Sequence, residues 1–166
     1  SREGTGQWPS IVFRFDSLPE PNPGRVGDAG SLRVQRSRGC LAPCTFCIEG
    51  QSNRTLPGER GWDGLRMETF IDRVESLTQK GVFFFNIIDS SFEDPGRRGI
   101  EDMLAFCRGC IEKMISASFK IHLRAENVLK LGKTEFDLMK QAGIDVIVCG
   151  LESGNEDELQ FYRKIA

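Results

Sequence analysis

Two hydrophobic periods run along the chain and predict its helices and strands. Short apolar runs predict strands, and longer stretches with apolar residues at every third or fourth position predict helices. The predicted strands are residues 32–37, 82–88, 119–123 and 144–149. The predicted helices are residues 67–80, 99–117 and 134–142, with a further helix that begins near Asn155. Because strands alternate with helices, the sequence predicts an α/β fold built from parallel βαβ units.

Local signals refine some of these elements. The run 82–88 is apolar at almost every position, which favours a strand buried on both faces and places the triplet Phe83–Phe85 in the core. Thr134 and Asp137 have the spacing of a capping box that would open the third helix. Gly143 follows that helix directly, as C-terminal glycine caps do.

The first 31 residues are interrupted by proline and glycine, so we interpret residues 1–31 as a lead-in and residues 32–166 as the folded unit. The chain starts at Ser1 rather than at Met and stops inside a predicted helix, so we expect a piece of a longer protein. A sheet of four strands cut in this way has an open edge, and we expect the piece alone to be poorly soluble.

Charge and hydropathy narrow the class of protein. The chain has 166 residues, and 22 Lys and Arg face 24 Asp and Glu, a net charge of −2. Nucleic-acid binders usually carry a basic surplus, so we expect no nucleic-acid partner. No apolar run approaches the roughly 20 residues of a membrane span, and no signal peptide opens the chain. We therefore expect a cytoplasmic protein without a membrane partner.

Three of the six cysteines form the clearest motif, C-x3-C-x2-C at Cys40, Cys44 and Cys47. Three thiolates on one short loop can bind a single metal centre, and three ligands on a four-iron cluster leave one iron open. A structural zinc needs four ligands, and Cys107 or Cys149 is the alternative fourth ligand. Disulfides are disfavoured, because disulfide scaffolds are short, loop-rich secreted chains.

The residues around this motif resemble the radical S-adenosylmethionine (SAM) superfamily. The segment Ser37–Cys47, with the aromatic Phe46 before the last cysteine, resembles the cluster loop of that superfamily. Ile88–Phe92 and Gly150–Gly154 resemble strand ends in the branch that includes cobalamin-dependent members and methylthiotransferases. Residues 32–166 follow the family in order and spacing.

The resemblance implies a fold and a chemistry. The family fold is a parallel, partial six-stranded (βα) barrel, of which this chain would supply about four strands. The resemblance implies a 4Fe–4S cluster on Cys40, Cys44 and Cys47. In the family, SAM binds the open iron, and an electron from a reductant such as flavodoxin or ferredoxin cleaves it to methionine and a 5′-deoxyadenosyl radical. No catalytic residue beyond the cluster ligands is expected, since the cofactors carry the chemistry.

Charged residues at predicted strand ends are candidate SAM contacts, because functional groups of βα barrels collect at the carboxyl ends of the strands. We assign the SAM ammonium to Asp89, the carboxylate to Arg124 and the ribose to Glu152. Phe46 would lie against the adenine, and Ser90 and Ser153 are candidates beside these residues. The structural alternatives are a turn beginning at Asp89, an ion pair between Arg124 and Glu126, and a strand cap by Glu152.

Several questions stay open at this point. Cobalamin would bind a preceding domain with an Asp-x-His-x-x-Gly signature, which this chain lacks, since Lys120 and not Asp stands two positions before the single His122. His122 is interpreted as a packed interior residue. The runner-up functions are a methylthiotransferase acting on RNA or protein, and a non-catalytic iron–sulfur or zinc module.

Cys107 and Cys110 form a C-x-x-C that is either redox-active or, as cysteines on an apolar helix face, simply buried. Cys149 is interpreted as a core residue.

Overall fold

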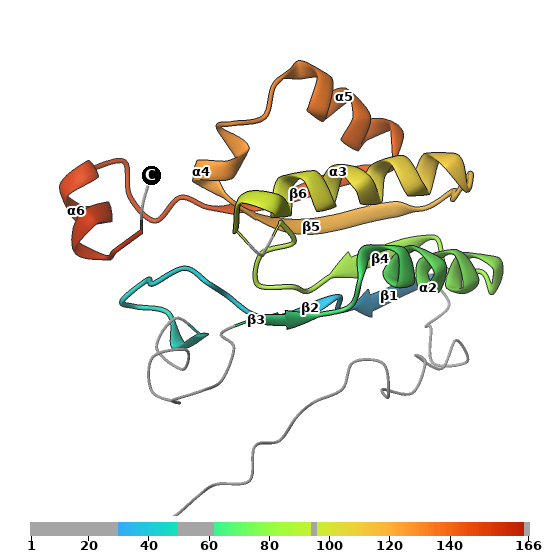
Figure 1. Cartoon of the computed structure of the whole chain (residues 1–166), viewed down its shortest axis with the longest axis horizontal. Helices are drawn as coiled ribbons and strands as arrows, with labels where there is room; N and C mark the ends of the chain where they lie inside the picture. The colour runs from blue at the N-terminus through green and yellow to red at the C-terminus, as the bar shows by residue number, and fades with distance from the viewer. Residues whose placement is uncertain (1–29, 50–61, 94–95, 165–166) are drawn as a thin grey trace, which may run out of the picture.

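The computed structural model describes residues 30–49, 62–93 and 96–164 (Figure 1). The predicted lead-in, residues 1–31, lies almost wholly outside the described residues. The predicted division of the chain at residue 31 therefore stays a prediction.

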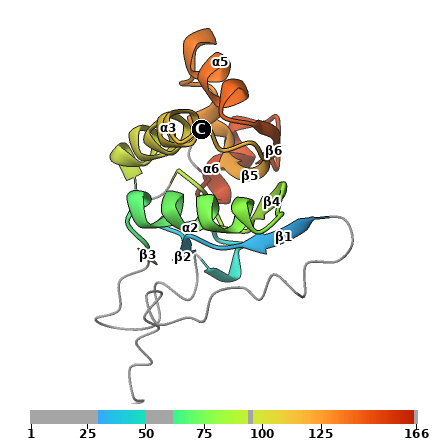
Figure 2. The ribbon, with the colours of Figure 1, turned by 90° about the vertical axis from the view of Figure 1, so that its right-hand side faces the viewer.

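A four-stranded parallel sheet forms the centre of the described chain. Its order is β1 (Ser31–Val34), β4 (Phe84–Ile87), β5 (Ser118–Arg124) and β6 (Ile144–Gly150). The helices are α2 (Met67–Gln79), α3 (Gly96–Glu112), α4 (Ala125–Val128), α5 (Lys133–Gln141) and α6 (Glu156–Phe161). Figure 2 shows α2, α3 and α5 on the same side of the sheet. The predicted parallel βα arrangement is confirmed, and α4 is an additional short helix that the sequence analysis missed.

The predicted strand 32–37 is wrong as a single element. It consists of β1 and a separate strand, β2 (Ser37–Gly39), which pairs antiparallel with β3 (Trp62–Gly64) in a two-stranded sheet. The chain changes partner at Arg36, whose N–H donates to the Asp89 carboxylate (2.7 Å) and whose carbonyl accepts from the Leu65 N–H (2.9 Å). β3 has only three residues and no apolar run, which explains why hydrophobic periodicity did not find it.

The core lies between the sheet and the helices that cover it. Alternate strand residues such as Phe85, Ile87 and Phe119 are completely buried and face the apolar sides of the helices. The expectation that residues 82–88 are buried on both faces is wrong, because Phe83 is 57% exposed and Ile88 is 44% exposed. Burial alternates along β4, so this strand covers the core with one face only.

Two predicted helix boundaries also need correction. The predicted helix 99–117 corresponds to α3, which ends at Glu112 rather than at residue 117. Met114 has a φ of 50°, outside the helical region, so the helix does not continue through it. α5 begins at Lys133, and the Glu135 carboxylate accepts from the Gly132 N–H (2.9 Å), so the Thr134–Asp137 pair does not cap it. The helix predicted near Asn155 is confirmed, and the Asn155 side chain caps it by accepting from the Asp157 and Glu158 N–H groups.

Candidate cluster and cofactor site

The cysteine motif lies on a loop that follows β2. Cys40, Cys44 and Cys47 are each half-buried. Burial raises the pKa of the Cys44 thiol, and the charge of the nearby Lys164 opposes this effect. Within residues 30–49, 62–93 and 96–164, no three Cys, His, Asp or Glu side chains lie close enough to hold a metal ion. Three accessible, uncrosslinked thiols still have the donor chemistry that an iron–sulfur cluster requires.

The cysteine loop contacts the end of α6, which comes more than a hundred residues later. The Thr45 N–H and the Thr45 hydroxyl both donate to the Tyr162 carbonyl, at 2.9 and 3.2 Å. The Phe46 ring stands edge-on to the Tyr162 ring, with centroids 5.6 Å apart. Figure 1 shows the loop and α6 at the same end of the sheet. Phe46 is otherwise 51% exposed, so one side of the ring is accessible.

A second contact joins the cysteine loop to the end of β4. The exposed Ser90 hydroxyl donates to the carboxylate of Glu49, which lies two residues after Cys47. The loop therefore contacts the segment that follows the carboxyl end of β4 and, through Tyr162, the segment that follows β6. Glu49 was not among the predicted site residues, because its place depends on how the loop folds back on β4.

The segment after β6 contains two further candidates. Glu152 has a φ of 62°, the left-handed region that non-glycine residues seldom occupy, and its carboxylate pairs with the Lys164 ammonium at 2.7 Å. The Ser153 hydroxyl donates to the Glu158 carboxylate (2.5 Å) and accepts from the Asn155 N–H (3.0 Å). Both residues follow the carboxyl end of β6, the position at which the sequence analysis predicted SAM contacts.

Asp89 lies at the end of β4 as predicted, but it is only 1% exposed. Its carboxylate accepts from the Arg36 N–H (2.7 Å) and from the Ser37 hydroxyl (2.6 Å), and the Arg36 guanidinium Nε is 3.9 Å away. Burial raises the pKa of the Asp89 carboxyl, against the hydrogen bonds from Ser37 and Arg36. These contacts favour the structural alternative, in which Asp89 holds the junction between β1 and β2.

Arg124 ends β5 and is paired inside the protein. Its Nε lies 3.3 Å from the Glu126 carboxylate, the partner named by the structural alternative, and 3.5 Å from that of Glu93. Glu93 is fully buried and also accepts from the Arg124 N–H (2.8 Å) and the Asn127 amide (3.0 Å). Sequence reasoning missed Glu93. Its position directly after the Ile88–Phe92 segment was the only available signal.

The remaining cysteines lie away from this loop or beside it. Cys107 and Cys110 are buried in α3, and burial raises the pKa of each thiol to about 12. Cys149, expected in the core, is half-buried near the end of β6. Its thiol pKa is raised by burial and lowered by the charge of Lys164, the same lysine that acts on Cys44.

We expect Cys107 and Cys110 to remain unmodified when the folded protein is treated with iodoacetamide at neutral pH. A pKa of about 12 keeps both sulfurs protonated, and only the thiolate is nucleophilic. Peptide mass spectrometry of the cluster-free protein measures this, with Cys47 as the accessible internal control. Equal alkylation of Cys107 and Cys47 would support a redox-active C-x-x-C instead.

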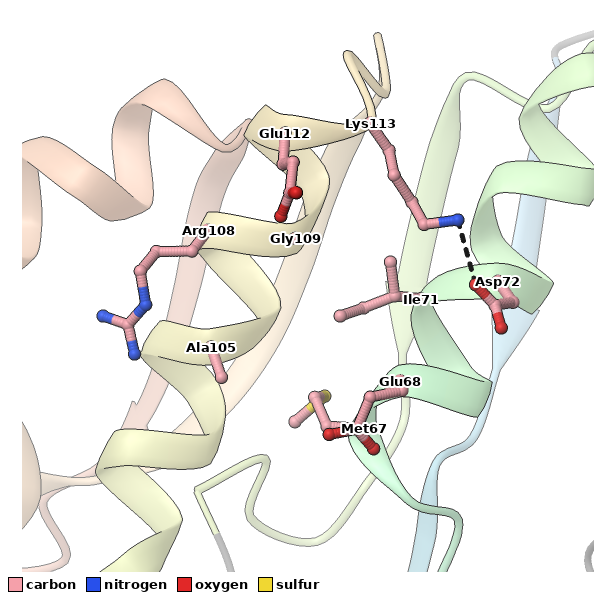
Figure 3. Close-up of a pocket in the computed structure, with 9 residues that line it drawn as sticks. All are labelled: Met67, Glu68, Ile71, Asp72, Ala105, Arg108, Gly109, Glu112 and Lys113. Carbon is pink, nitrogen blue, oxygen red and sulfur yellow. Dashed lines mark ion pairs between the residues drawn. The ribbon is translucent and has the colours of Figure 1, made fainter.

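A groove of about 650 Å³ lies between α2 and α3 (Figure 3). Met67 and Ile71 of α2 line it, and Lys113, directly after α3, pairs across it with Asp72 at 2.9 Å. None of the residues that line it belongs to the cysteine loop or to a strand end. The candidate site is therefore at the carboxyl edge of the sheet, and this groove is separate from it.

Sequence comparisons find similarity between this chain and two curated proteins. No protein-family model matches it. The 4'-phospho-dehydrooxetanocin synthase of Priestia megaterium is 25% identical over 170 residues, covering 90% of this chain and 22% of the synthase. The hopanoid C-3 methylase of Methylococcus capsulatus is 27% identical over 135 residues, covering 79% of this chain and 23% of the methylase. The chain thus spans about a fifth of the length of these two curated relatives.

Solved structures with the same fold carry the expected cofactors. The cobalamin-dependent S-adenosylmethionine radical enzyme OxsB, with aqua-cobalamin and SAM bound, has a TM-score of 0.63 and 24% identity, over 82% of this chain and 20% of OxsB. The radical SAM methyltransferase TsrM of Kitasatospora setae, with tryptophan and a SAM analogue bound, has a TM-score of 0.62 and 18% identity, over 81% of this chain and 24% of TsrM. A second TsrM structure contains cobalamin and a [4Fe-4S] cluster.

These findings bear on the fold and on the family that the chain resembles. The similarity extends over most of the chain in both comparisons, and it confirms the predicted α/β fold with a parallel partial barrel. The cofactors of the structural neighbours are those that the sequence resemblance implies, namely SAM, a 4Fe–4S cluster and cobalamin. In sequence and in fold, the chain resembles the cobalamin-dependent branch of the radical SAM enzymes.

Proposed function

We propose that this chain is the N-terminal part of a radical SAM core that binds a 4Fe–4S cluster and cleaves SAM reductively. The observation that carries the proposal is the position of the three thiols of Cys40, Cys44 and Cys47. Their loop is tied through Ser90 and Glu49 to the end of β4, and through Thr45 to the segment after β6. In parallel βα folds, this edge of the sheet is where ligands bind.

Each candidate residue receives a role that matches its contacts. Cys40, Cys44 and Cys47 would hold three irons and leave the fourth open to SAM. When bound, the reduced cluster supplies the electron that breaks a carbon–sulfur bond of SAM. The chain itself positions SAM, and the exposed face of Phe46 is available to the adenine. Glu152 is 35% exposed, which leaves its carboxylate accessible to the ribose hydroxyls.

The other predicted SAM contacts are assigned differently. Asp89 and Arg124 would act on SAM indirectly, by fixing the ends of the strands, because their side chains are engaged with protein partners. Ser90 and Ser153 would hold Glu49 and the segment after β6 in place through the hydrogen bonds described above. The three thiolates thus remain the only groups proposed to touch the cluster.

The whole protein that carries this chain would use cobalamin bound outside the present residues. The Priestia and Methylococcus relatives are a synthase and a methylase, and the OxsB and TsrM structures contain cobalamin. We therefore propose a transferase or a radical rearrangement on a small molecule, with a flavodoxin- or ferredoxin-type reductant. Within the described residues, no helix is long and apolar enough to cross a membrane. A methylthiotransferase and a non-catalytic metal module are the alternatives.

Anaerobic reconstitution with iron and sulfide tests this proposal. We expect the protein to acquire a 4Fe–4S cluster whose electron paramagnetic resonance spectrum, after reduction, changes when SAM is added, because SAM occupies the open iron. Zinc is the matched competing metal. Tight binding of zinc without iron would favour the structural module, and a cluster whose spectrum ignores SAM would contradict the enzyme.

A further inference from the structure

α6 is a short helix with defined signals at both ends. The Asn155 side chain caps its start. At its end, the Arg163 N–H donates to the Gln160 carbonyl (2.9 Å), and the Lys164 N–H donates to the Leu159 carbonyl (2.8 Å). Arg163 has a φ of 53°, so this is a Schellman motif with arginine in place of the usual glycine. The motif stops the helix and fixes the direction in which the following residue leaves it.

That direction brings Lys164 to the end of β6. The Lys164 ammonium donates to the Gly150 carbonyl (2.7 Å) and to the Glu152 carboxylate (2.7 Å). The Lys164 side chain is only 11% exposed, although the residue lies outside any helix or strand. A Cβ atom at Gly150 would lie 2.5 Å from the Glu152 carboxylate and 3.1 Å from the ammonium, so a side chain there would displace the carboxylate from its present position.

Tyr162, two residues before Lys164, contacts the cysteine loop. The Tyr162 carbonyl accepts both hydrogen bonds of Thr45, and the Tyr162 ring packs on Phe46. Thr45 and Phe46 lie between two of the cysteines, Cys44 and Cys47. A single turn of chain, Tyr162–Lys164, is therefore in contact with the cysteine loop on one side and with β6 on the other.

We propose that Lys164 is a positioning residue. It anchors the end of α6 to β6, so that Tyr162 holds the cysteine loop in place, and it keeps Glu152 in the left-handed conformation that presents its carboxylate. The left-handed region costs a non-glycine residue free energy, so its surroundings must hold it there. The Lys164 ammonium forms an ion pair with this carboxylate. The part of this inference that concerns SAM rests on the proposed function, whereas the anchoring of the loop does not.

The first experiment uses protein without a cluster and is independent of the proposed function. Hydrogen exchange of the Thr45 amide is measured in the wild type and in Lys164→Met. We expect exchange to accelerate by about tenfold or more, the change associated with loss of a charge-assisted hydrogen bond. Lys164→Arg should restore slow exchange. Lys140→Met, a substitution at an exposed lysine of α5, is the control for loss of a surface charge.

The second experiment measures the SAM affinity of the cluster-loaded full-length protein that contains this chain. Glu152→Ala should weaken SAM binding by roughly ten- to a hundredfold, since a charge-assisted contact is lost. Lys164→Met should weaken it in the same direction. Adding Lys164→Met to Glu152→Ala should have little further effect, because residues that act through one another are not additive. Lys164→Arg should recover most of the wild-type affinity.

The outcomes separate the two claims. If the wild type binds no cluster or no SAM, the proposed function fails, and the exchange of Thr45 alone decides the inference. If Glu152→Ala weakens SAM binding while Lys164→Met leaves both the affinity and the exchange of Thr45 unchanged, the proposed function stands and the inference is overturned. Circular dichroism of each variant establishes that the fold is retained.

Discussion

Replacing Cys44 by alanine should abolish the absorbance of the iron–sulfur cluster after anaerobic reconstitution. Three thiolates are the minimum set for a four-iron cluster with one open iron, so the substitution removes a ligand that the cluster requires. Iron content and visible absorbance of the purified protein measure the effect. The secondary structure should stay intact, because Cys44 is half-buried on a loop and lies outside the core.

Two control variants make this result specific. Cys149 is half-buried and responds to the same Lys164 charge as Cys44, which makes it the closest candidate for a replacement ligand. Cys107 lies in α3 and is buried in the hydrophobic core. We expect Cys149→Ala and Cys107→Ala to retain iron. Equal loss of iron from Cys44→Ala and Cys149→Ala would instead favour a four-cysteine metal site.

The periodic elements could be predicted from the sequence because they depend on local patterns. β5 and α2 each have a regular period of buried residues, and their predicted positions are close to the observed ones. The division of the first predicted strand could not be found in this way. It depends on Asp89, which is 53 residues away from Arg36 and supplies the hydrogen bond that ends β1.

The candidate site was predictable in its location but not in its internal contacts. Charged residues after apolar strands indicate the carboxyl edge of a parallel sheet, and Asp89, Arg124 and Glu152 all lie there. Whether such a side chain faces solvent or the protein depends on partners that are distant in sequence. Glu93 is an example, since its carboxylate joins the end of β4 to the start of α4 through contacts with Arg124 and Asn127.

Asp89→Ala should destabilise the protein by about 3–5 kcal/mol, the cost typical of removing one partner of a buried charged pair. The substitution would leave Arg36 buried without its carboxylate and would remove the acceptor for the Arg36 N–H and the Ser37 hydroxyl. Chemical denaturation measures the free energy of unfolding. Asp72→Ala is the matched control, because that carboxylate is 67% exposed and its pair with Lys113 should contribute only about 0–1 kcal/mol.

The pH dependence of this contribution has a definite sign. Burial raises the pKa of Asp89 in the folded protein above its usual value of 3.8. As the pH rises through the window between the unfolded and the folded pKa, the unfolded chain releases its proton first. The contribution of Asp89 to stability is therefore complete below the unfolded pKa and declines as the pH rises through the folded pKa.

Asp89→Asn isolates that contribution, because asparagine keeps an acceptor oxygen for the Arg36 N–H but does not titrate. The stability of the wild type relative to Asp89→Asn should fall as the pH rises above about 4, the usual range of an aspartate. A relative stability that increases with pH would mean that the charged carboxylate is favoured by the fold. If Asp89→Ala kept its full stability and lost only SAM affinity, Asp89 would be a SAM ligand, as the strand-end argument first suggested.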